Sequence, residues 1–233
     1  MADFSAFCRL VASSEAPPWL ARFDLPGFGA SPLPAGPAGS TEYAEIVCQA
    51  IRQVVADMNS SSRVKVVVVG HSFGGRIALS MGASYAPDLN LAGVVVSGVP
   101  LIRSPDLSKK PKLGFRVAKS LFKLGLVSSA RMEKLRSRYG STDYRNSQGV
   151  MREIFVRVVN EDYSEIIRRI EVPVNLLWGD GDKTVPVVVA ERALQLNAEK
   201  LSLTMVPGDH FVAVTSPAVL LDSVLDLVQR TRG

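Results

Sequence analysis

The segment VVVVGHSFGGRIALS, residues 66–80, limits more than any other the folds open to this chain of 233 residues. The valines of residues 64–69 predict a strand that is buried on both faces of a parallel sheet. This strand ends at Gly70, and the small and apolar residues from Arg76 onward predict a helix after a sharp turn. A buried parallel strand followed directly by a helix is typical of α/β proteins.

The turn between this strand and helix carries a pattern with chemical meaning. Residues Gly70-His71-Ser72-Phe73-Gly74 match G-x-S-x-G, the nucleophile elbow, in which a serine projects from the end of a strand. The flanking glycines relieve the crowding that a Cβ atom would cause. The sequence therefore predicts Ser72 as a candidate nucleophile, and the alternative is an ordinary serine in a turn.

A serine hydroxyl is a weak nucleophile unless a base, usually a histidine oriented by a carboxylate, takes its proton. The chain has two histidines, and we expect the His71 side chain to turn back toward its own strand. His210, which follows the last predicted strand in VPGDHF, is therefore the candidate base, and a surface histidine is the alternative. The strand before it ends in LLWGDGDKTVP, which offers Asp180 and Asp182 as orienting carboxylates, and Asp209 is a third candidate.

The remaining pattern alternates between helical and extended stretches. An amphipathic stretch covers residues 4–11, and a proline- and glycine-rich loop precedes the first long helix. The predicted strands are 19–25, 64–69, 91–97, 174–178 and 201–206, and the predicted helices are 41–58, 76–85, 112–126, 150–160 and 219–229. This alternation predicts an α/β fold with a mostly parallel sheet flanked by helices.

The middle of the chain departs from this alternation. Charged helical segments predict a helical cap over residues 100–171, inserted into a core formed by residues 1–99 and 172–233. The insert is basic, because residues 101–170 contain 16 lysines and arginines against 7 acidic residues, whereas the whole chain has a net charge of +5. The run of lysines and Arg116 between residues 109 and 123 is most simply a solvated helix face, and attraction of an anionic substrate or of lipid headgroups is the functional alternative.

Four motifs make the chain resemble the α/β-hydrolase fold superfamily. They are DLPGFGAS at 24–31, GHSFGG at 70–75, WGDGDKTVP at 178–186 and PGDH at 207–210. The resemblance implies that Ser72 is the nucleophile, Asp182 the acid and His210 the base, with the backbone N–H of Phe73 as one oxyanion donor. A serine at the nucleophile position favours acyl chemistry over the alkyl-enzyme chemistry of branches that use aspartate.

The sequence also departs from that superfamily at its beginning. In relatives, a second oxyanion donor comes from a His-Gly loop some way before DLPGFG, and this sequence has no such motif. We therefore expect the chain to begin just after that loop and to lack the first strands of the sheet. In the superfamily one of those strands lies between the strands predicted here at 19–25 and 64–69.

These observations predict a serine hydrolase that acts on a small or medium acyl ester or on a related carbonyl compound, with an anionic substrate as one option. The alternatives are a C–C hydrolase of dienoic diketone-type substrates with the same triad, and a catalytically inactive hydrolase-like binding protein. Neither a metal nor an organic cofactor is implied, and no nucleic-acid signature accompanies the basic residues. The absence of a signal peptide and of a long apolar run predicts a cytoplasmic protein. Cys8 and Cys48 lack a metal-ligand spacing and are expected to be buried apolar residues.

Overall fold

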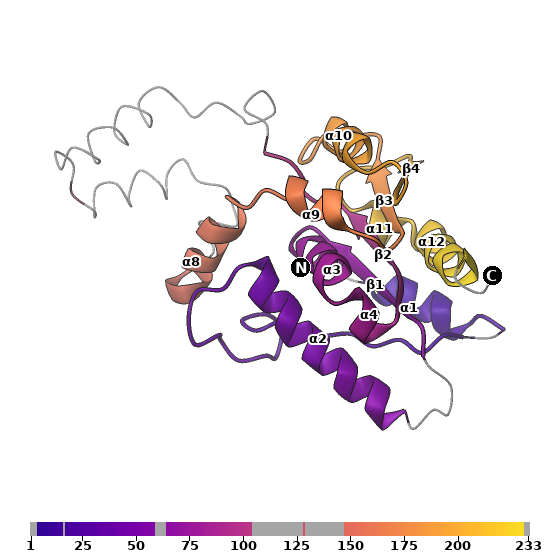
Figure 1. The fold of residues 1–233 in the computed structure, drawn as a ribbon, viewed down its shortest axis with the longest axis horizontal. Coiled ribbons are helices and arrows are strands. Elements are labelled where there is room, and N and C mark those ends of the chain that lie inside the picture. Colours follow the sequence, from indigo (N-terminus) through magenta and orange to yellow (C-terminus); the bar gives the residue numbers. More distant parts are fainter. Residues whose placement is uncertain (1–3, 16, 59–63, 104–127, 129–146, 231–233) are drawn as a thin grey trace.

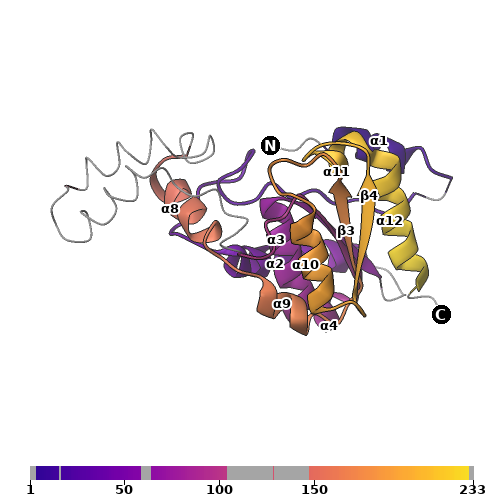
Figure 2. The ribbon, with the colours of Figure 1, turned by 90° about the horizontal axis from the view of Figure 1, so that it is seen from above.

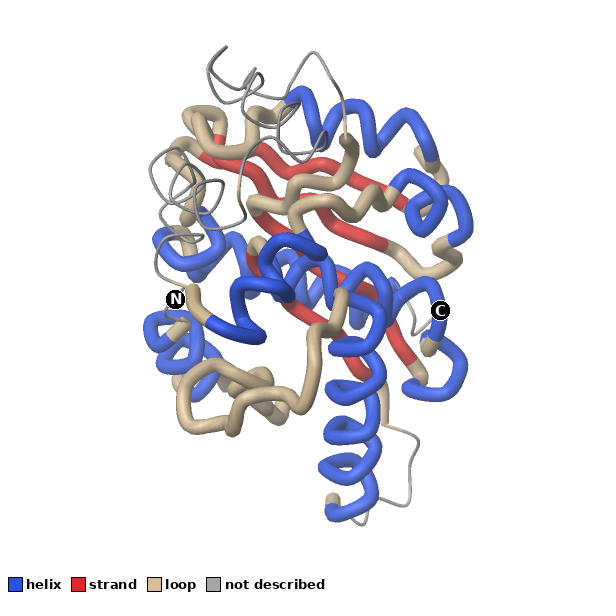
Figure 3. Tube along the Cα trace, turned by 90° about the vertical axis from the view of Figure 1, so that its left-hand side faces the viewer, coloured by secondary structure: helices blue, strands red, loops and turns tan. Residues whose placement is uncertain are grey.

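The sheet at the centre of the molecule carries the predicted site residues beyond the carboxyl ends of its strands. The computed structural model describes residues 4–15, 17–58, 64–103, 128 and 147–230. Within these residues a single parallel sheet has the strand order β1-β2-β3-β4, and the strands lie side by side in Figure 3. Their bounds are Val66–His71 for β1, Leu91–Ser97 for β2, Val174–Gly179 for β3 and Leu201–Val206 for β4.

Helices cover both faces of this sheet, as Figures 1 and 2 show. One face carries α3, α9 and α10, with α2 packed outside α3, and the other carries α1, α11 and α12. The bounds are Ser5–Ala12 for α1, Ser40–Asp57 for α2, Phe73–Ser84 for α3, Ala86–Leu89 for α4, Gly149–Val158 for α8, Ser164–Arg169 for α9, Val188–Leu196 for α10, Val212–Thr215 for α11 and Pro217–Arg230 for α12. The predicted α/β class, with a parallel sheet flanked by helices, is confirmed. The helix predicted at 112–126 lies outside the described residues.

Alternate residues of the central strands supply the two halves of the core. Val94 and Val96 of β2 pack on the α3 and α10 side, whereas Val95 packs on the α12 side. Every residue of β2 and β3 is buried, as expected for a parallel sheet covered on both faces. The valines of β1 are only partly buried, because β1 is an edge strand of the described sheet.

The strand that carries the elbow is displaced along the sequence from its prediction. β1 begins at Val66 instead of residue 64 and continues through Gly70 and His71, which lie opposite Val96 and Ser97 of β2. The strand therefore extends into the motif itself. As a result, the elbow is fixed by backbone hydrogen bonding to the neighbouring strand on one side.

The prediction of a strand at residues 19–25 is wrong. This segment is extended but unpaired within the described residues, and it is exposed, with the Trp19 side chain 88% accessible. A strand forms only where a neighbouring strand accepts its backbone hydrogen bonds. Within the described residues, no strand of the sheet lies beside this segment to accept them.

The two cysteines differ in their burial. Cys48 is buried, as predicted, and burial raises the pKa of its thiol to about 11. Cys8 is partly exposed on α1, so the expectation that it is buried is wrong.

None of the helices that the structure describes combines the length and apolar character needed to cross a membrane.

Candidate active site

Ser72 occupies the sharp turn between β1 and α3. Its backbone has φ +50° and ψ −111°, a conformation that L-residues rarely adopt outside strained functional turns. The Ser72 N–H donates to the carbonyl oxygen of Ser97 at 2.9 Å, which ties the turn to the end of β2. The side chain is only partly buried. The strand, strained turn and helix are those of a nucleophile elbow.

The tightly packed glycines of the elbow are only partly the two glycines of the G-x-S-x-G motif. A Cβ atom on Gly70 would lie 2.3 Å from the carbonyl oxygen of Gly74, and one on Gly75 would lie 2.3 Å from the Val99 side chain. A Cβ atom on Gly74 would meet no atom of the described residues within 4 Å. The glycine required for packing α3 against the sheet is therefore Gly75, although Gly70 is required as expected.

His210 and Asp182 form a hydrogen-bonded pair beyond the ends of β4 and β3. The Nδ1 atom of His210 lies 2.8 Å from Oδ2 of Asp182, whose side chain is 1% exposed. The other carboxylate oxygen of Asp182 accepts hydrogen bonds from the N–H groups of Thr184 and Val185, each at 2.8 Å. These contacts occupy both oxygens of the carboxylate, as burial of a polar group requires.

Contacts between the two loops bring these side chains together. The Gly181 N–H donates to the Gly208 carbonyl at 2.8 Å, and the Gly208 N–H donates to the Asp180 carboxylate at 3.1 Å. Asp209 accepts from the Phe211 N–H at 2.9 Å, within its own loop. Of the three aspartates considered from the sequence, Asp182 is the one whose carboxylate contacts His210, whereas Asp180 and Asp209 hold the loops.

The site contains a group of aromatic rings that the sequence did not indicate. The expectation that the His71 side chain turns back toward its own strand is wrong, because its ring centroid lies 4.8 Å from that of His210 in an edge-to-face arrangement. The Phe211 ring, 47% exposed, lies against both histidines, with centroid distances of 5.4 and 5.2 Å. Burial and, after it, the charge of His210 lower the pKa of His71 to about 4, so His71 is neutral at pH 7.

Phe73 is the first residue of α3, and its N–H therefore belongs to the helix N-terminus, where backbone donors lack intrahelical partners. Its side chain packs against Tyr43 at 5.0 Å and against Phe28 of the DLPGFG loop at 5.9 Å, measured between ring centroids. These contacts position the loop motif beside the turn that carries Ser72. In the described part of the chain, the Ser72 hydroxyl forms no hydrogen bond with His210. Hydrogen bonds of this kind are often long or poorly aligned in sites without a bound ligand.

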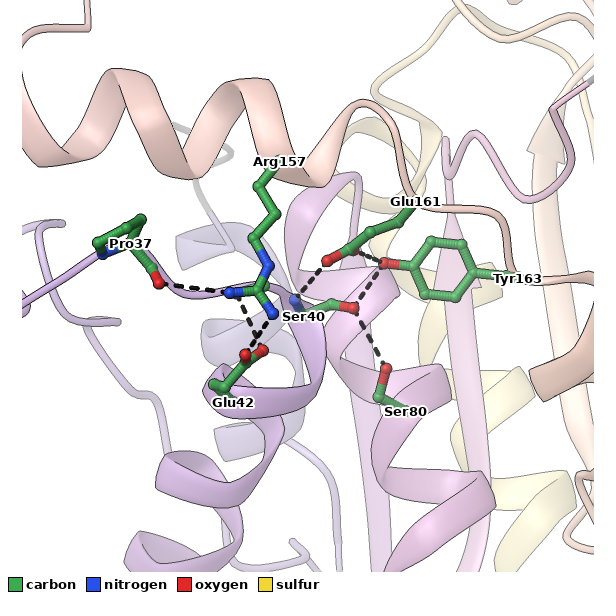
Figure 4. Close-up of polar contacts among 8 residues, drawn as sticks. Pro37, Ser40, Glu42, Ser80, Arg157, Glu161 and Tyr163 are labelled. Carbon is green, nitrogen blue, oxygen red and sulfur yellow. Dashed lines mark hydrogen bonds and ion pairs between the residues drawn. The ribbon is translucent and has the colours of Figure 1, made fainter.

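The end of the predicted cap is attached to the core next to α3. Figure 4 shows the Tyr163 hydroxyl in contact with Ser40 Oγ at 2.6 Å and with the carboxylate of Glu161. Glu161 also accepts from the Ser40 N–H at 3.0 Å, at the N-terminus of α2. Arg76 of α3, on the same helix as the elbow, donates to the Val158 carbonyl at 2.8 Å, and its guanidinium lies over the Tyr163 ring at 5.3 Å. The helix that begins at the elbow is therefore joined to the segment that follows α8.

Acidic, histidine and cysteine side chains are also the usual metal ligands. Among the residues that the structure describes, no three of them are grouped so as to hold a metal ion. Asp182 and His210 are paired with each other instead.

A sequence model of the alpha/beta hydrolase family matches residues 4–223, nearly the whole chain. The chain belongs to the alpha/beta hydrolase family. This membership confirms the predicted superfamily and its fold, and it confirms that the chain is an enzyme of the hydrolase class.

Known proteins are similar to this alpha/beta hydrolase over most of its length, at low sequence identity. The 2-(acetamidomethylene)succinate hydrolase of Mesorhizobium japonicum is 23% identical over 222 residues, which cover 88% of this chain and 76% of that protein. MGS-M2, an alpha/beta hydrolase enzyme from a Medee basin deep-sea metagenome library, has a TM-score of 0.67 at 17% identity, covering 98% of this chain and 86% of its own. A thermophilic esterase from Thermogutta terrifontis has a TM-score of 0.54 at 18% identity, with coverages of 88% and 78%.

Proposed function

We propose that this alpha/beta hydrolase cleaves a small or medium acyl ester through a Ser72 acyl-enzyme, with His210 as base and Asp182 as its orienting carboxylate. The observation that carries the proposal is the 2.8 Å contact between His210 Nδ1 and the buried Asp182 carboxylate. This pair follows the carboxyl ends of β3 and β4, and the Ser72 elbow follows the carboxyl end of β1. Parallel α/β sheets gather catalytic groups at the carboxyl ends of their strands.

Acylation begins when the Ser72 Oγ attacks the ester carbonyl carbon and its proton passes to His210 Nε2. Because Asp182 holds the proton on Nδ1, the unprotonated nitrogen is Nε2, which is the atom that accepts. The carbonyl oxygen becomes an oxyanion, and the Phe73 N–H at the helix N-terminus donates to it. The tetrahedral adduct then expels the alcohol, which takes the proton from His210.

Deacylation repeats these steps with water as the nucleophile. His210 removes a proton from water, the resulting hydroxide attacks the acyl-enzyme carbonyl, and the protonated histidine returns its proton to Ser72 Oγ as the acid leaves. The buried Asp182 carboxylate stabilises the imidazolium that forms in both halves of the cycle.

Residues 100–171 form, in this proposal, a cap over the site, joined to the core residues 1–99 and 172–233. The attachment of Tyr163 and Glu161 beside α2 supports a fixed base for such a cap. The basic excess of residues 101–170 favours an anionic acyl substrate. The relative from Mesorhizobium japonicum, whose named substrate is a succinate, is consistent with that preference.

The test is covalent labelling of the purified chain with a fluorophosphonate, followed by the mass of the intact protein. We expect a single adduct that is absent from Ser72→Ala, strongly slowed in His210→Ala and unchanged in the exposed control Ser13→Ala. Circular dichroism would establish that each variant is folded. A folded chain that forms no adduct would contradict the proposal and favour the hydrolase-like binding protein.

Substrate class is then tested by hydrolysis rates. p-Nitrophenyl acetate and butyrate probe simple esters, and 2-(acetamidomethylene)succinate probes the compound for which the curated relative is named. We expect faster hydrolysis of an ester that carries a carboxylate than of its neutral analogue. Equal rates for the charged and neutral esters would remove the preference for anions without affecting the acyl-enzyme.

A further inference from the structure

The mechanism above does not use His71, although this side chain lies within the site. Its Nδ1 atom is 3.3 Å from the Ser97 hydroxyl oxygen, and its ring meets the His210 ring edge to face with an interplanar angle of 63°. The Ser97 carbonyl also accepts the N–H of Ser72. One residue at the end of β2 therefore holds both His71 and the backbone of the nucleophile.

Gly98 leaves room for both imidazoles, because it has no side chain. It has φ +60°, and a Cβ atom placed there would lie 2.7 Å from His210 Cε1 and 2.8 Å from His71 Cε1. Both rings therefore rest on the backbone of the same glycine. Since they share this space, removal of one ring gives the other room to rotate.

The packing of His71 against His210 is compatible with a His210 base that alternates between neutral and charged forms. The His71 ring is largely buried and is bound to an uncharged hydroxyl, so it can lie against the His210 ring without opposing the positive charge that His210 acquires during the reaction. Asp182 lies on the Nδ1 side of His210 and compensates that charge. The neutral ring contributes packing and the carboxylate contributes the electrostatic stabilisation.

We propose that His71 is a positioning residue for His210: its imidazole, bound to Ser97 and seated on Gly98, keeps the His210 ring in the orientation that leaves Nδ1 on Asp182. The catalytic part of this inference rests on the proposed function, in which His210 is the base. Misplacement of a reacting group by about 1 Å can cost about a hundredfold in rate, so a positioning side chain has a measurable effect on kcat.

The experiment compares His71→Ala, which removes the ring, with His71→Phe, which restores a ring of similar size without the hydrogen bond to Ser97. With p-nitrophenyl butyrate we expect His71→Ala to lower kcat by about 10- to 100-fold at unchanged KM, and His71→Phe to recover most of this loss. Thermal unfolding of both variants shows that the folded state is being compared.

A second readout does not depend on turnover. The proton shared by His210 Nδ1 and Asp182 gives a far-downfield proton NMR signal, which can be assigned by its loss in Asp182→Asn. We expect this signal in the wild type and in His71→Phe, and we expect fast exchange to remove it in folded His71→Ala.

Two results would overturn the inference: a His71→Ala variant with wild-type kcat and an intact signal, or a folded His71→Phe variant that is as impaired as His71→Ala in both readouts. If the wild type forms no Ser72 adduct but the signal still depends on the ring at position 71, the hydrolase function fails and the positioning role stands.

Discussion

Asp182 combines a buried charge with a complete set of hydrogen bonds. One of its oxygens accepts from two backbone N–H groups, and the other lies on His210 Nδ1. These donors fix the carboxylate plane before any substrate binds, so the tautomer of His210 is determined by the resting protein. The exposed Asp180, two residues earlier, accepts only from the Gly208 N–H among the described contacts, and its role is to hold the loop.

We expect Asp182→Asn to lower kcat/KM for p-nitrophenyl butyrate by about 10³- to 10⁴-fold. The amide nitrogen would replace an acceptor with a donor opposite His210 Nδ1 and would favour the tautomer whose Nε2 carries the proton and cannot accept one from Ser72. The matched control is Asp180→Asn, whose amide oxygen can still accept from Gly208, and we expect its rate to stay within about twofold of the wild type. Similar losses in the two variants would mean that loop structure, not the carboxylate on His210, is responsible.

At the scale of elements, the attachment between α2, α3 and the segment after α8 uses buried polar groups. Tyr163 is 1% exposed and Ser40 is 2% exposed, and their hydroxyls are hydrogen-bonded to each other. Burial first, and then the hydrogen bond to Glu161, raises the pKa of the Tyr163 hydroxyl, so it remains a neutral donor at all ordinary pH values. A nearby ion pair between Arg157 and Glu42 has about half of each side chain in solvent.

We expect Tyr163→Phe to lower the free energy of unfolding by about 1–3 kcal/mol, because it leaves Ser40 and Glu161 without their shared partner. Arg157→Gln breaks the neighbouring exposed ion pair, and its expected cost is at most about 1 kcal/mol. Urea unfolding of the two variants and the wild type at pH 7 measures both values. A cost for Tyr163→Phe that does not exceed that of Arg157→Gln would contradict a buried attachment at the base of the cap.

Across the whole molecule, the sequence predicted best those elements whose pattern is local. The strands at 91–97 and 201–206 have the predicted bounds, because each is a short apolar run between turn signals. Residues 19–25 have comparable strand character but lack a strand beside them, and one sequence pattern does not report its neighbour. β1 begins and ends two residues later than predicted, because its pairing with β2 includes Gly70 and His71.

The candidate site also has a part that local sequence patterns predict and a part that depends on contacts between strands. The positions of Ser72, Asp182 and His210 follow from motifs at strand ends, and their order along the chain is a local property of the sequence. The packing of His71 on His210 over Gly98 depends on three strand ends that meet only in the folded sheet. In the sequence, a glycine directly after a buried strand is the one signal that could have directed attention to position 98, and the structure gives that glycine a positive φ.

The packing of His71 between these strand ends also makes the stability of the whole molecule depend on pH. The pKa of His71, lowered by burial and then by His210, is about 4 in the folded chain against an ordinary value of 6.5. The unfolded chain therefore binds a proton here at a higher pH than the folded chain, and the free energy of unfolding falls as the pH drops from 6.5 toward 4. Besides burial, the groups that shift the His71 pKa are His210 and the N-terminal charge, which lower it, and Asp182 and the Ser97 backbone, which raise it; the Ser97 hydroxyl lies at its Nδ1 atom.

His71→Phe removes this titration but keeps His210 and Asp182, whose contributions remain in both proteins. Between pH 7 and pH 4 we expect the wild type to lose about 1–2 kcal/mol more unfolding free energy than the variant, a value reduced for the partial exposure of the ring. Urea unfolding at several pH values in that interval measures the difference. Above pH 7 the two curves should run parallel, since His71 is then neutral in both the folded and the unfolded chain. Parallel curves down to pH 4 would instead mean that the folded chain protonates His71 as readily as the unfolded one, which a ring packed between Gly98 and His210 should not allow.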